Sequence, residues 1–405
     1  MRDVAVTGAG LLTPIGHDVA TNWDGFRSGR LGIVRAPAST GWHGWWAGVP
    51  DAFLDGRLDA TTAKRTDRFA RYALICADEA LRAAGIAQPD AERTAIVLGT
   101  SMGGVPALVD ARAQLDTQGS AHVPPRLMAY VIPNMAAAAL ALRYGLHGPQ
   151  LTIAAACASS IDAIGHGARL IERGDADVAL CGGTETLLTP VVAWSLQHAG
   201  ALSSAPDAAR ASLPFDVARS GFVMGDGCGV VVLEAGERAR ARGAPVLGYV
   251  RGYGSIADGY HPTSPEPSGR WEARAMELAL RDAQVEADAI DAIFAHGTAT
   301  VVGDAVEIAA IDAIAGGRAV PIPVTSLKGH VGHAMAASGV TSVIVALRGM
   351  AEATLVPTLG STHLDPAARF DLVTGAPRAL AMRTVQVNAF GFGGQNASLV
   401  LADRP

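Results

Sequence analysis

The chain of 405 residues resembles itself, and this internal repeat limits its possible folds more than any other feature. Residues 73–101 are typical of an amphipathic helix through Ala84, followed by a turn and a strand at Thr94–Leu98. Residues 274–300 show the same order of helix, turn and strand. Each of the two strands ends in a Gly-Thr pair, so the match extends to single residues.

A second pair of segments, residues 151–180 and 323–357, also corresponds. Each contains a long run of small residues typical of a closely packed helix. Cys157 and His333 lie at similar places, each at the expected start of its helix. One match of helix, turn and strand could arise by chance in any α/β protein, but two matches in the same order indicate a duplication.

We therefore predict two related βαβ-rich halves, residues 1–245 with the cysteine and residues 246–405 with the histidine. The small Gly, Ala and Ser faces of the two helices are expected to pack closely at the centre. Hydrophobic residues make up 49% of the chain and charged residues 17%, which is enough apolar material for a large core.

Composition excludes several classes of function. The net charge of -6 gives no electrostatic reason to expect nucleic acid or an anionic membrane as partner. No apolar run reaches the roughly 18 residues of a membrane span, and glycines at positions 8 and 10 interrupt the apolar N-terminal stretch. The four cysteines have no CxxC spacing, so neither zinc nor a disulfide framework is indicated. We expect a cytoplasmic protein.

Cys157 is the first candidate for chemistry. It stands between a strand that ends in small residues and a helix, which places its sulfur on a sharp turn at a helix N-terminus. The helix dipole and free N–H groups there favour the thiolate. The alternative interpretation is a small buried residue among alanines.

Two histidines are the next candidates. His296 follows an apolar strand and enters a turn, a position well placed for a site in α/β folds. His333 comes five residues after Lys328, among small residues that leave room for a ligand. His330 is the weaker candidate, and we expect a structural or entrance residue there. Each histidine alone could also be an ordinary core residue.

A glycine-rich loop near the C-terminus, residues 391–394, can turn freely and aim backbone N–H groups at a developing oxyanion. The loop is not the GxGxxG fingerprint of a dinucleotide site. The segment Gly8-Ala9-Gly10 also lacks the full fingerprint, so we do not expect a dinucleotide to bind.

One Cys, two His and a glycine loop at turns of a duplicated fold form a specific combination. Over essentially its whole length the chain resembles the β-ketoacyl-acyl carrier protein synthases, the elongating ketosynthases of the thiolase superfamily. The motifs that carry the resemblance occur in the family's order: VAVTGAGLLTPIG, DRFARYAL, ACASS, LPFDVARSGFVMGDGCGVVVLE, DGYHPTSPEPSG, HGTATVVGDAVE, SLKGHVGH and NAFGFGGQN.

The resemblance implies an α/β fold of the thiolase-like duplicated kind, with five layers in the order αβαβα. It also implies a decarboxylative Claisen condensation, in which a Cys-bound acyl group joins malonyl-acyl carrier protein to give a 3-oxoacyl-carrier protein. In such a scheme Cys157 is the acyl acceptor, while His296 and His333 are the paired histidines. Lys328 matches the family's buried lysine, expected to form an ion pair with Glu307 that fixes His333.

Further roles are implied around these residues. Asp304 is expected to support the turn after His296, and the N–H groups of Cys157 and Phe392 to form the oxyanion hole. Phe392 also matches the family's gating aromatic residue. Thr298 and Thr300 match the threonines that bind the pantetheine arm of the substrate carrier.

Other positions concern the acyl pocket and the carrier. Met102 matches a position that lines the acyl pocket. Ala299 replaces the second glycine of the family's usual HGTGT, and Gly200 stands where relatives often carry a carrier-docking arginine. We therefore expect docking to rest on other basic residues, namely Lys64, Arg65, Arg68 and Arg126. The enzyme is expected to bind no cofactor, because its substrates arrive on the phosphopantetheine arm of acyl carrier protein.

Three alternatives differ in residues that can be checked. A non-catalytic chain-length-factor subunit loses the cysteine and usually the histidines, all of which are present. A degradative thiolase uses a second cysteine as base, and no cysteine follows Cys228. In a cysteine hydrolase, His296 and His333 would both need other roles. The departures at Ala299 and Gly200, with the Ala- and Arg-rich composition, favour a type II polyketide enzyme over fatty-acid elongation. A homodimer or a heterodimer with a chain-length factor is expected.

Overall fold

The computed structural model describes residues 2–405, which form a mixed α/β molecule around one continuous sheet of 11 strands. The strands of the first half are β1 (Val4–Leu12), β4 (Thr94–Gly99), β5 (Gln150–Ile153), β6 (Val178–Glu185) and β8 (Gly227–Ala235). Those of the second half are β9 (Gly248–Ala257), β10 (Ala292–Phe294), β11 (Pro323–Thr325), β13 (Asp371–Leu372), β15 (Thr384–Gly391) and β16 (Gln395–Ala402).

The two halves have the same strand order, which confirms the duplicated fold. The first half runs β5-β4-β6-β8-β1 and the second runs β11-β10-β15-β16-β9, with β13 added at the end. In both, the first two pairings are parallel and the last two antiparallel. A short antiparallel pairing of β1 with β9, from Val4 opposite Val250 to Val6 opposite Gly248, joins the halves into one sheet.

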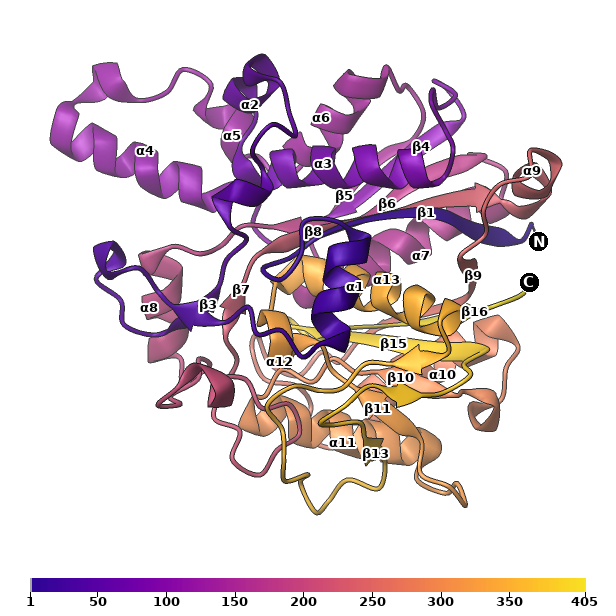
Figure 1. Cartoon of the computed structure of the whole chain (residues 1–405). Helices are drawn as coiled ribbons and strands as arrows, with labels where there is room; N and C mark the ends of the chain where they lie inside the picture. Colours follow the sequence, from indigo (N-terminus) through magenta and orange to yellow (C-terminus); the bar gives the residue numbers. More distant parts are fainter. Residues whose placement is uncertain (1) are drawn as a thin grey trace.

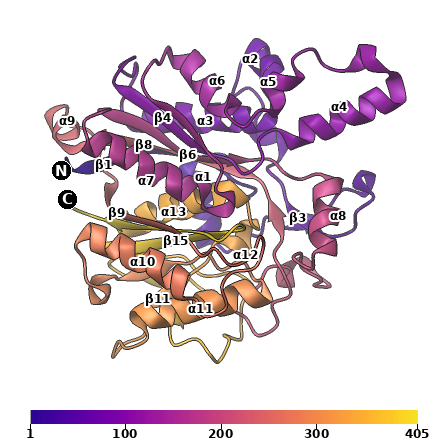
Figure 2. The same ribbon diagram turned by 180° about the vertical axis from the view of Figure 1, so that it is seen from behind.

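Helices cover the sheet in three layers, and Figures 1 and 2 show the resulting five-layered arrangement. The outer layer of the first half contains α3 (Arg68–Ala83) and α6 (Met135–Tyr144), and that of the second contains α10 (Arg270–Ala283) and α11 (Val301–Ala315). Between the two halves of the sheet lie α7 (Ser159–Glu172) and α13 (Ser338–Ala351), which contact strands of both. The expected five layers are confirmed.

Small residues bring the two central helices together, as the sequence predicted. A Cβ atom added to Gly339 of α13 would lie 2.7 Å from the Cγ1 atom of Ile161 in α7. In addition, the backbone N–H of Val340 donates to the Ser160 hydroxyl at 3.0 Å. Only glycine at position 339 permits this close approach.

The remaining elements are shorter or peripheral. The helices are α1 (Val19–Arg27), α2 (Ala60–Arg65), α4 (Val105–Gln118), α5 (Leu127–Val131), α8 (Pro190–His198), α9 (Gly236–Ala241) and α12 (Lys328–Val331). Two small sheets contain β2 (Val34–Arg35), β3 (Trp45–Ala47) and β7 (Met224–Gly225), and β12 (Thr354–Leu355) with β14 (Arg378–Ala379). None of the helices within residues 2–405 has the length and apolar character needed to cross a membrane.

The predicted helix through Ala84 and strand Thr94–Leu98 correspond to α3 and β4, each within one residue of its expected end. The corresponding elements of the second half are α10 and β10. We propose that the two halves divide between residues 245 and 246, within the loop that joins α9 to β9.

The predicted equivalence of Cys157 and His333 is wrong. A 3-10 turn precedes each central helix, Ala156–Ala158 before α7 and Met335–Ala337 before α13. The first residue of each turn has a positive φ, 47° and 43°. Aligned on these turns, Cys157 corresponds to Ala336, and His333 lies outside the turn.

The short helix α12 explains the difference. It ends at Gly332, whose φ of 65° turns the chain out of the helix. His333 then lies in an extended segment that forms an isolated parallel bridge with Met224. A helix of four residues is too short to leave a periodic pattern in the sequence.

Candidate active site

A strained turn presents Cys157. The preceding residue, Ala156, has a φ of 47°, a conformation that non-glycine residues seldom adopt. The hydroxyl of Ser159 stabilises the turn, since it accepts from the backbone N–H of Ala155 at 2.9 Å and donates to the Ala156 carbonyl at 2.6 Å. Cys157 is only 7% exposed.

Three side chains from distant parts of the sequence converge at this point. The Sγ atom of Cys157 lies 3.0 Å from the Nε2 atom of His333. The rings of His296 and His333 meet edge to face with centroids 5.2 Å apart. One potential ligand or donor atom from each of the three residues lies within 4.8 Å of the others. The structure thus brings together the cysteine and both histidines that the sequence predicted.

Sulfur and two imidazole nitrogens could also hold a metal ion. Tetrahedral zinc, with bonds of about 2.3 Å to sulfur and 2.0 Å to nitrogen, would separate those two ligand atoms by about 3.6 Å. The separation of 3.0 Å between Sγ and Nε2 is shorter and suits a hydrogen bond.

His333 is held from several sides. Its Nδ1 atom lies 2.9 Å from the Ser338 hydroxyl, its backbone N–H donates to the Val223 carbonyl at 2.7 Å, and Phe222 packs edge-on against its ring.

Burial, aided by the positive charge of Lys328, holds the pKa of His333 well below its usual value. Burial likewise lowers the pKa of His296, with smaller contributions from Lys328 and His333. Both imidazoles are therefore neutral near pH 7.

Burial also raises the pKa of the Cys157 thiol to about 11. The Lys328 charge and the backbone N–H groups of Phe392 and Cys157 act in the opposite direction, whereas Glu185 raises the pKa further. The expectation that the helix N-terminus would favour a resting thiolate is wrong, because desolvation outweighs these N–H groups. At neutral pH the site holds a thiol hydrogen-bonded to a neutral imidazole.

Two buried charged groups hold the backbone of the His296 turn. The carboxylate of Glu307 accepts from the N–H of His296 at 2.7 Å and from that of Gly297 at 2.6 Å. The Lys328 ammonium donates to the His296 carbonyl. Burial lowers the pKa of Lys328 and raises the pKa of Glu307.

The expected direct ion pair between Lys328 and Glu307 is therefore wrong. Within residues 2–405 no nitrogen–oxygen contact of 4 Å or less joins the two side chains. They bind the same peptide turn at different atoms instead, and the residue whose backbone they fix is His296 rather than His333. The spacing of Lys328 and Glu307 along the sequence is the same whether the two side chains pair with each other or each bind the peptide turn at His296.

The next residues of this turn carry the predicted threonines. Asp304 accepts from the backbone N–H of Ala299 at 3.0 Å and of Phe215 at 2.7 Å. This contact holds Ala299 at a φ of 67°, where a glycine would be unstrained. The hydroxyls of Thr298 and Thr300 lie 3.0 Å apart, and Thr300 also caps α11 by accepting from the N–H of Gly303.

Phe392 lies in the tight turn between β15 and β16 and is 44% exposed. The turn approaches the nucleophile closely, because a Cβ atom at Gly391 would lie 3.0 Å from the Ala155 carbonyl oxygen and 3.1 Å from the Cys157 nitrogen. The absence of a side chain at Gly391 brings the backbone next to Phe392 close to Cys157, and the N–H of Phe392 lowers the pKa of the thiol.

Two further predicted residues concern the acyl pocket and the docking surface. Met102, which was expected to line an acyl pocket, is 48% exposed on the loop before α4. Arg68 is engaged within the fold, where it donates to the Tyr72 hydroxyl at 2.6 Å and to the Val49 carbonyl at 2.7 Å. It is therefore not a free docking residue. The other three residues of the predicted docking set are exposed: Lys64, Arg65 and Arg126.

His330 is a structural residue, one of the two roles considered for it. It is fully buried, and its ring nitrogens lie 3.2 Å from the Arg30 carbonyl and 2.9 Å from the Pro357 carbonyl. Its side chain thus ties three segments together away from Cys157.

Two polar residues at the site, Glu185 and Ser338, were not predicted from the sequence. Glu185, at the end of β6, is fully buried and accepts from the backbone N–H groups of Ser101 at 2.9 Å and Ala336 at 3.4 Å. Ser338 contacts His333. A carboxylate at a strand end was the available signal for Glu185, whereas a serine in a small-residue helix gives none.

Comparison with known proteins places the chain among condensing enzymes. The family described as beta-ketoacyl synthase, N-terminal domain, matches residues 1–239, and its C-terminal domain matches residues 247–362. A 3-oxoacyl-[acyl-carrier-protein] synthase 2 of Synechocystis sp. is 37% identical, over 98% of this chain and 97% of the relative. The enzyme of the same name from Staphylococcus aureus is 35% identical over 98% of each chain.

Solved structures agree with the fold. A beta-ketoacyl synthase from Burkholderia phymatum has a TM-score of 0.91 and 32% identity, and the match covers 100% of both chains. A type II PKS ketosynthase bound to the hexaketide, in complex with its acyl-carrier protein, has a TM-score of 0.91 and 27% identity over 99% of each chain. The ishigamide ketosynthase/chain length factor has a TM-score of 0.90 and 30% identity, again over 99% of each chain.

Proposed function

The chain belongs to the β-ketoacyl synthase family and is an enzyme of the acyltransferase class, and from this we propose that it catalyses decarboxylative condensation of a Cys157-bound acyl group with malonyl-acyl carrier protein. The observation that carries the proposal is the contact of 3.0 Å between the Cys157 sulfur and the His333 imidazole, with His296 beside it.

In the first half-reaction the acyl group moves from the carrier thioester to Cys157. The thiol is neutral at rest, so its proton must pass to Nε2 of His333 as the sulfur attacks the carbonyl carbon. The N–H groups of Cys157 and Phe392, which lower the pKa of the thiol, would bind the oxyanion that forms. The carrier then leaves as a thiol.

In the second half-reaction malonyl-acyl carrier protein loses carbon dioxide, and the electron pair of the broken bond passes to the thioester enolate. Neutral imidazoles at positions 296 and 333 would donate to the enolate oxygen. The enolate carbon then attacks the acyl group on Cys157 and breaks its sulfur–carbon bond, which gives a 3-oxoacyl-carrier protein. The released sulfur takes a proton from Nε2 of His333, and one proton from solvent returns to the imidazole. The buried contacts to Glu307 and Lys328 support His296 in this role, since they fix its backbone.

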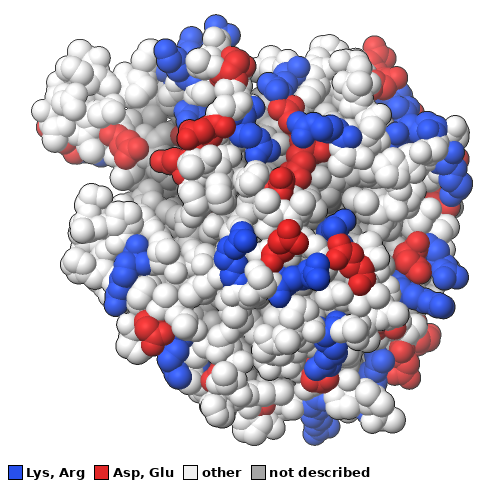
Figure 3. All heavy atoms as spheres, in the orientation of Figure 1, with Lys and Arg blue, Asp and Glu red and all other residues white. Residues whose placement is uncertain are grey.

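The partner we propose is an acyl carrier protein, which reaches the site through its phosphopantetheine arm. Thr298 and Thr300 would bind that arm, and exposed Lys64, Arg65 and Arg126 would contribute to carrier docking. On the face that Figure 3 shows of residues 2–405, basic and acidic side chains are interspersed. A carrier would therefore meet local groups of basic residues rather than a uniformly positive surface.

For the pathway we propose type II polyketide synthesis, which the likeness to ketosynthases of that kind supports. Fatty-acid elongation is the second candidate, favoured by the 37% identity to a 3-oxoacyl-[acyl-carrier-protein] synthase 2. The acyl substrates that the enzyme accepts would distinguish the polyketide pathway from the fatty-acid pathway. An elongation enzyme extends saturated acyl carriers, whereas a polyketide enzyme extends chains that retain their keto groups.

We also propose that the chain acts as a dimer, with a second copy or with a chain-length factor. Strand β5 is the outermost strand of the sheet, so one side of its backbone has no neighbouring strand in this chain. Leu151 of β5 is 44% exposed and Leu142 of α6 is 85% exposed. A partner at this edge would bury both side chains and cover the loop that carries Met102.

Intact-protein mass spectrometry tests the proposed chemistry. After incubation with acyl carrier thioesters the chain should gain the mass of the acyl group, and Cys157→Ala should gain none. The variant His296→Ala should still become acylated but fail to release carbon dioxide from malonyl carrier protein. An unchanged mass gain in Cys157→Ala, or rapid decarboxylation by His296→Ala, would contradict the mechanism.

A further inference from the structure

We propose that Ser338 is a positioning residue that lets His333 exchange its tautomer between the two half-reactions. This inference rests on the proposed function, because the two half-reactions require opposite protonation states of the Nε2 atom of His333. In acyl transfer its Nε2 atom must accept the Cys157 proton, whereas in decarboxylation the same atom must donate a hydrogen bond.

The geometry places Ser338 where it controls that choice. The Ser338 hydroxyl lies 2.9 Å from Nδ1 of His333, while Nε2 lies 3.0 Å from the Cys157 sulfur. A neutral imidazole carries one N–H, and the partner of one ring nitrogen decides which nitrogen has it. A hydroxyl can both donate and accept, so it supports either tautomer. A carboxylate or a carbonyl at this place would stabilise only the Nδ1–H form.

In the resting enzyme the neutral thiol donates to Nε2, so the imidazole proton is on Nδ1 and is donated to Ser338. In the acylated enzyme the thiol proton is gone. Ser338 can then donate to Nδ1, which leaves the proton on Nε2, directed at the substrate. The imidazole is neutral in both states, as burial of His333 requires.

The duplication provides an internal comparison. Ser338 is the counterpart of Ser159, since each is the first residue of a central helix after a 3-10 turn. Ser159 uses its hydroxyl to hold the backbone of its own turn, at Ala155 and Ala156. The corresponding turn before α13 forms without such contacts, because among residues 2–405 the only hydrogen-bond partner of the Ser338 hydroxyl is His333. Its hydroxyl is thus available to the imidazole.

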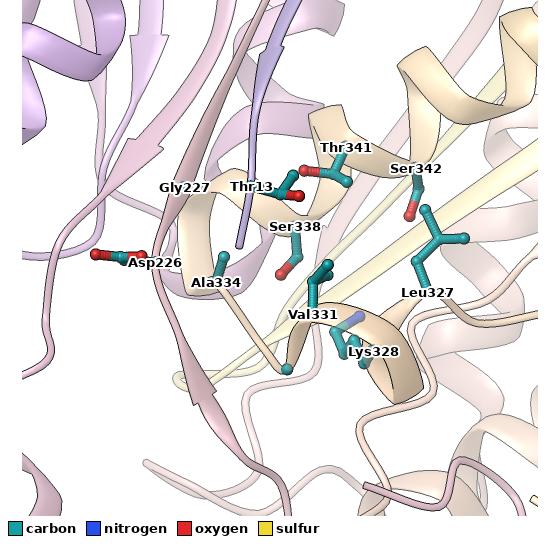
Figure 4. A pocket seen from close by; sticks show the side chains of 11 residues that line it. Thr13, Asp226, Gly227, Leu327, Lys328, Val331, Ala334, Ser338, Thr341 and Ser342 are labelled. Atoms are coloured by element: carbon teal, nitrogen blue, oxygen red, sulfur yellow. The ribbon is translucent and has the colours of Figure 1, made fainter. Parts of the chain in front are cut away.

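A small cavity lined by Ser338, and by Gly332 and Ala334 on either side of His333 in the chain, would provide a path for the displaced proton. Figure 4 shows Ser338 on its wall, together with Thr13, Thr341 and Lys328. Its volume of about 10 Å³ is close to that needed for one water molecule. A water there would take the hydroxyl proton of Ser338 when Ser338 accepts the proton of Nδ1.

The protons balance over acyl transfer. The Cys157 thiol proton moves to Nε2 as the sulfur–carbon bond forms and the carrier sulfur–carbon bond breaks. The Nδ1 proton passes through Ser338 to water, and the departing carrier thiolate takes one proton from water. Two protons are present before the step, on sulfur and Nδ1, and two after it, on Nε2 and the carrier thiol.

The ¹⁵N spectrum of the imidazoles tests the exchange directly. We expect protonation of Nδ1 of His333 in the free enzyme and of Nε2 after acylation of Cys157 by hexanoyl-carrier protein. The His333→Ala variant identifies the resonances. The same tautomer in both states would overturn the proposal. Failure of the wild-type enzyme to become acylated would instead count against the proposed function.

Variants test the kinetic consequence. Ser338→Ala should slow both half-reactions by about tenfold or more, a part of the general acid–base contribution, and Ser338→Thr, which keeps the hydroxyl, should restore most of the rate. Ser361→Ala is the matched control, because it removes a buried hydroxyl that donates to the Pro214 carbonyl at 2.7 Å. Rates in Ser338→Ala equal to those of the control would overturn the proposal, as would equal losses in the Ala and Thr variants.

Discussion

At the scale of single residues, the reactive pair is neutral before substrate binds. Burial raises the pKa of Cys157 and lowers that of His333, so neither carries its charge near pH 7. The proton of Cys157 therefore passes to His333 during acyl transfer and not before substrate binds. This arrangement limits side reactions of the sulfur with other electrophiles, because a thiol is a far weaker nucleophile than a thiolate.

The first prediction follows from that thiol. The rate of Cys157 alkylation by iodoacetamide should rise about tenfold per pH unit between pH 6 and 9, because the thiolate fraction does so below a pKa of about 11. At pH 7 Lys328→Met should react more slowly, because the lysine charge lowers the pKa of the thiol. Mass spectrometry of the alkylated peptide measures both rates.

Cys157→Ala is the control for this labelling, since the other three cysteines are buried with no exposed surface. A wild-type rate that levels off below pH 8 would show that the thiol has an ordinary or lowered pKa.

The second prediction concerns Glu185. Burial raises its pKa from 4.5 to about 7, so the folded chain retains a proton that the unfolded chain loses between these pH values. Stability is consequently lost as pH rises from 4.5 to 7, by about 3 kcal/mol for this group. Across that range the unfolding free energy of the wild type should fall relative to that of Glu185→Gln. Urea unfolding at several pH values measures the difference.

Glu92→Gln, an exposed substitution, should follow the wild-type pH dependence of stability. Parallel curves for the wild type and Glu185→Gln would mean that the Glu185 carboxyl is ionised in the folded chain across this range.

At the scale of elements, the position of Cys157 depends on how closely β4 approaches the start of α7. A Cβ atom at Gly99 would lie 2.6 Å from the carbonyl carbon of Ser159 and 2.7 Å from its Cβ atom. Because these are mainly backbone atoms at a helix start, a larger residue at position 99 must displace the helix.

The third prediction is that Gly99→Ala lowers the unfolding free energy by about 1–3 kcal/mol, the usual cost of overpacking, and slows acylation of Cys157. Chemical denaturation and the rate of mass gain from an acyl carrier measure the two effects. Gly317→Ala is the control, since its Cβ atom would have no neighbour within 4 Å. Lost stability with an unchanged acylation rate would show that the turn at Cys157 does not depend on this contact.

The helices and strands also show which parts of the structure can be predicted from a sequence. The α3–β4 unit and its copy α10–β10 could be predicted, because amphipathic helices followed by apolar strands leave clear periodic patterns. Residues Cys157, His296 and His333 could be identified by resemblance to a family. Their neighbours could not. The contact of Glu185 with Ala336 depends on packing between segments more than 150 residues apart, and that of Ser338 with His333 depends on the turn between them.

The errors have the same origin. The pKa of Cys157 depends on burial, and the pairing of Lys328 and Glu307 depends on the path of one peptide turn. Neither is encoded in spacing along the chain.

At the scale of the whole molecule, the exposed edge at β5 leads to the fourth prediction. Leu151→Asp should convert the proposed dimer to a monomer, because a charge at the edge of a sheet disfavours pairing with another strand. Light scattering after size exclusion measures the mass of the particle. Val320→Asp is the matched control, since Val320 is 75% exposed and lies next to β11 in the other half. A Leu151→Asp protein of wild-type mass would place the interface elsewhere.

The join between the halves has a consequence for the ends of the chain. Val250 of β9 lies opposite Val4 of β1 on one side and opposite Leu401 of β16 on the other. Because neighbouring strands are about 4.8 Å apart, Val4 and Leu401, each near an end of the chain, are held about 10 Å from each other. A short peptide could link them, and the chain could then be cut in the loop between α9 and β9 to give a circular permutant. The order of the two halves along the chain would be reversed, with every strand still beside its present neighbours.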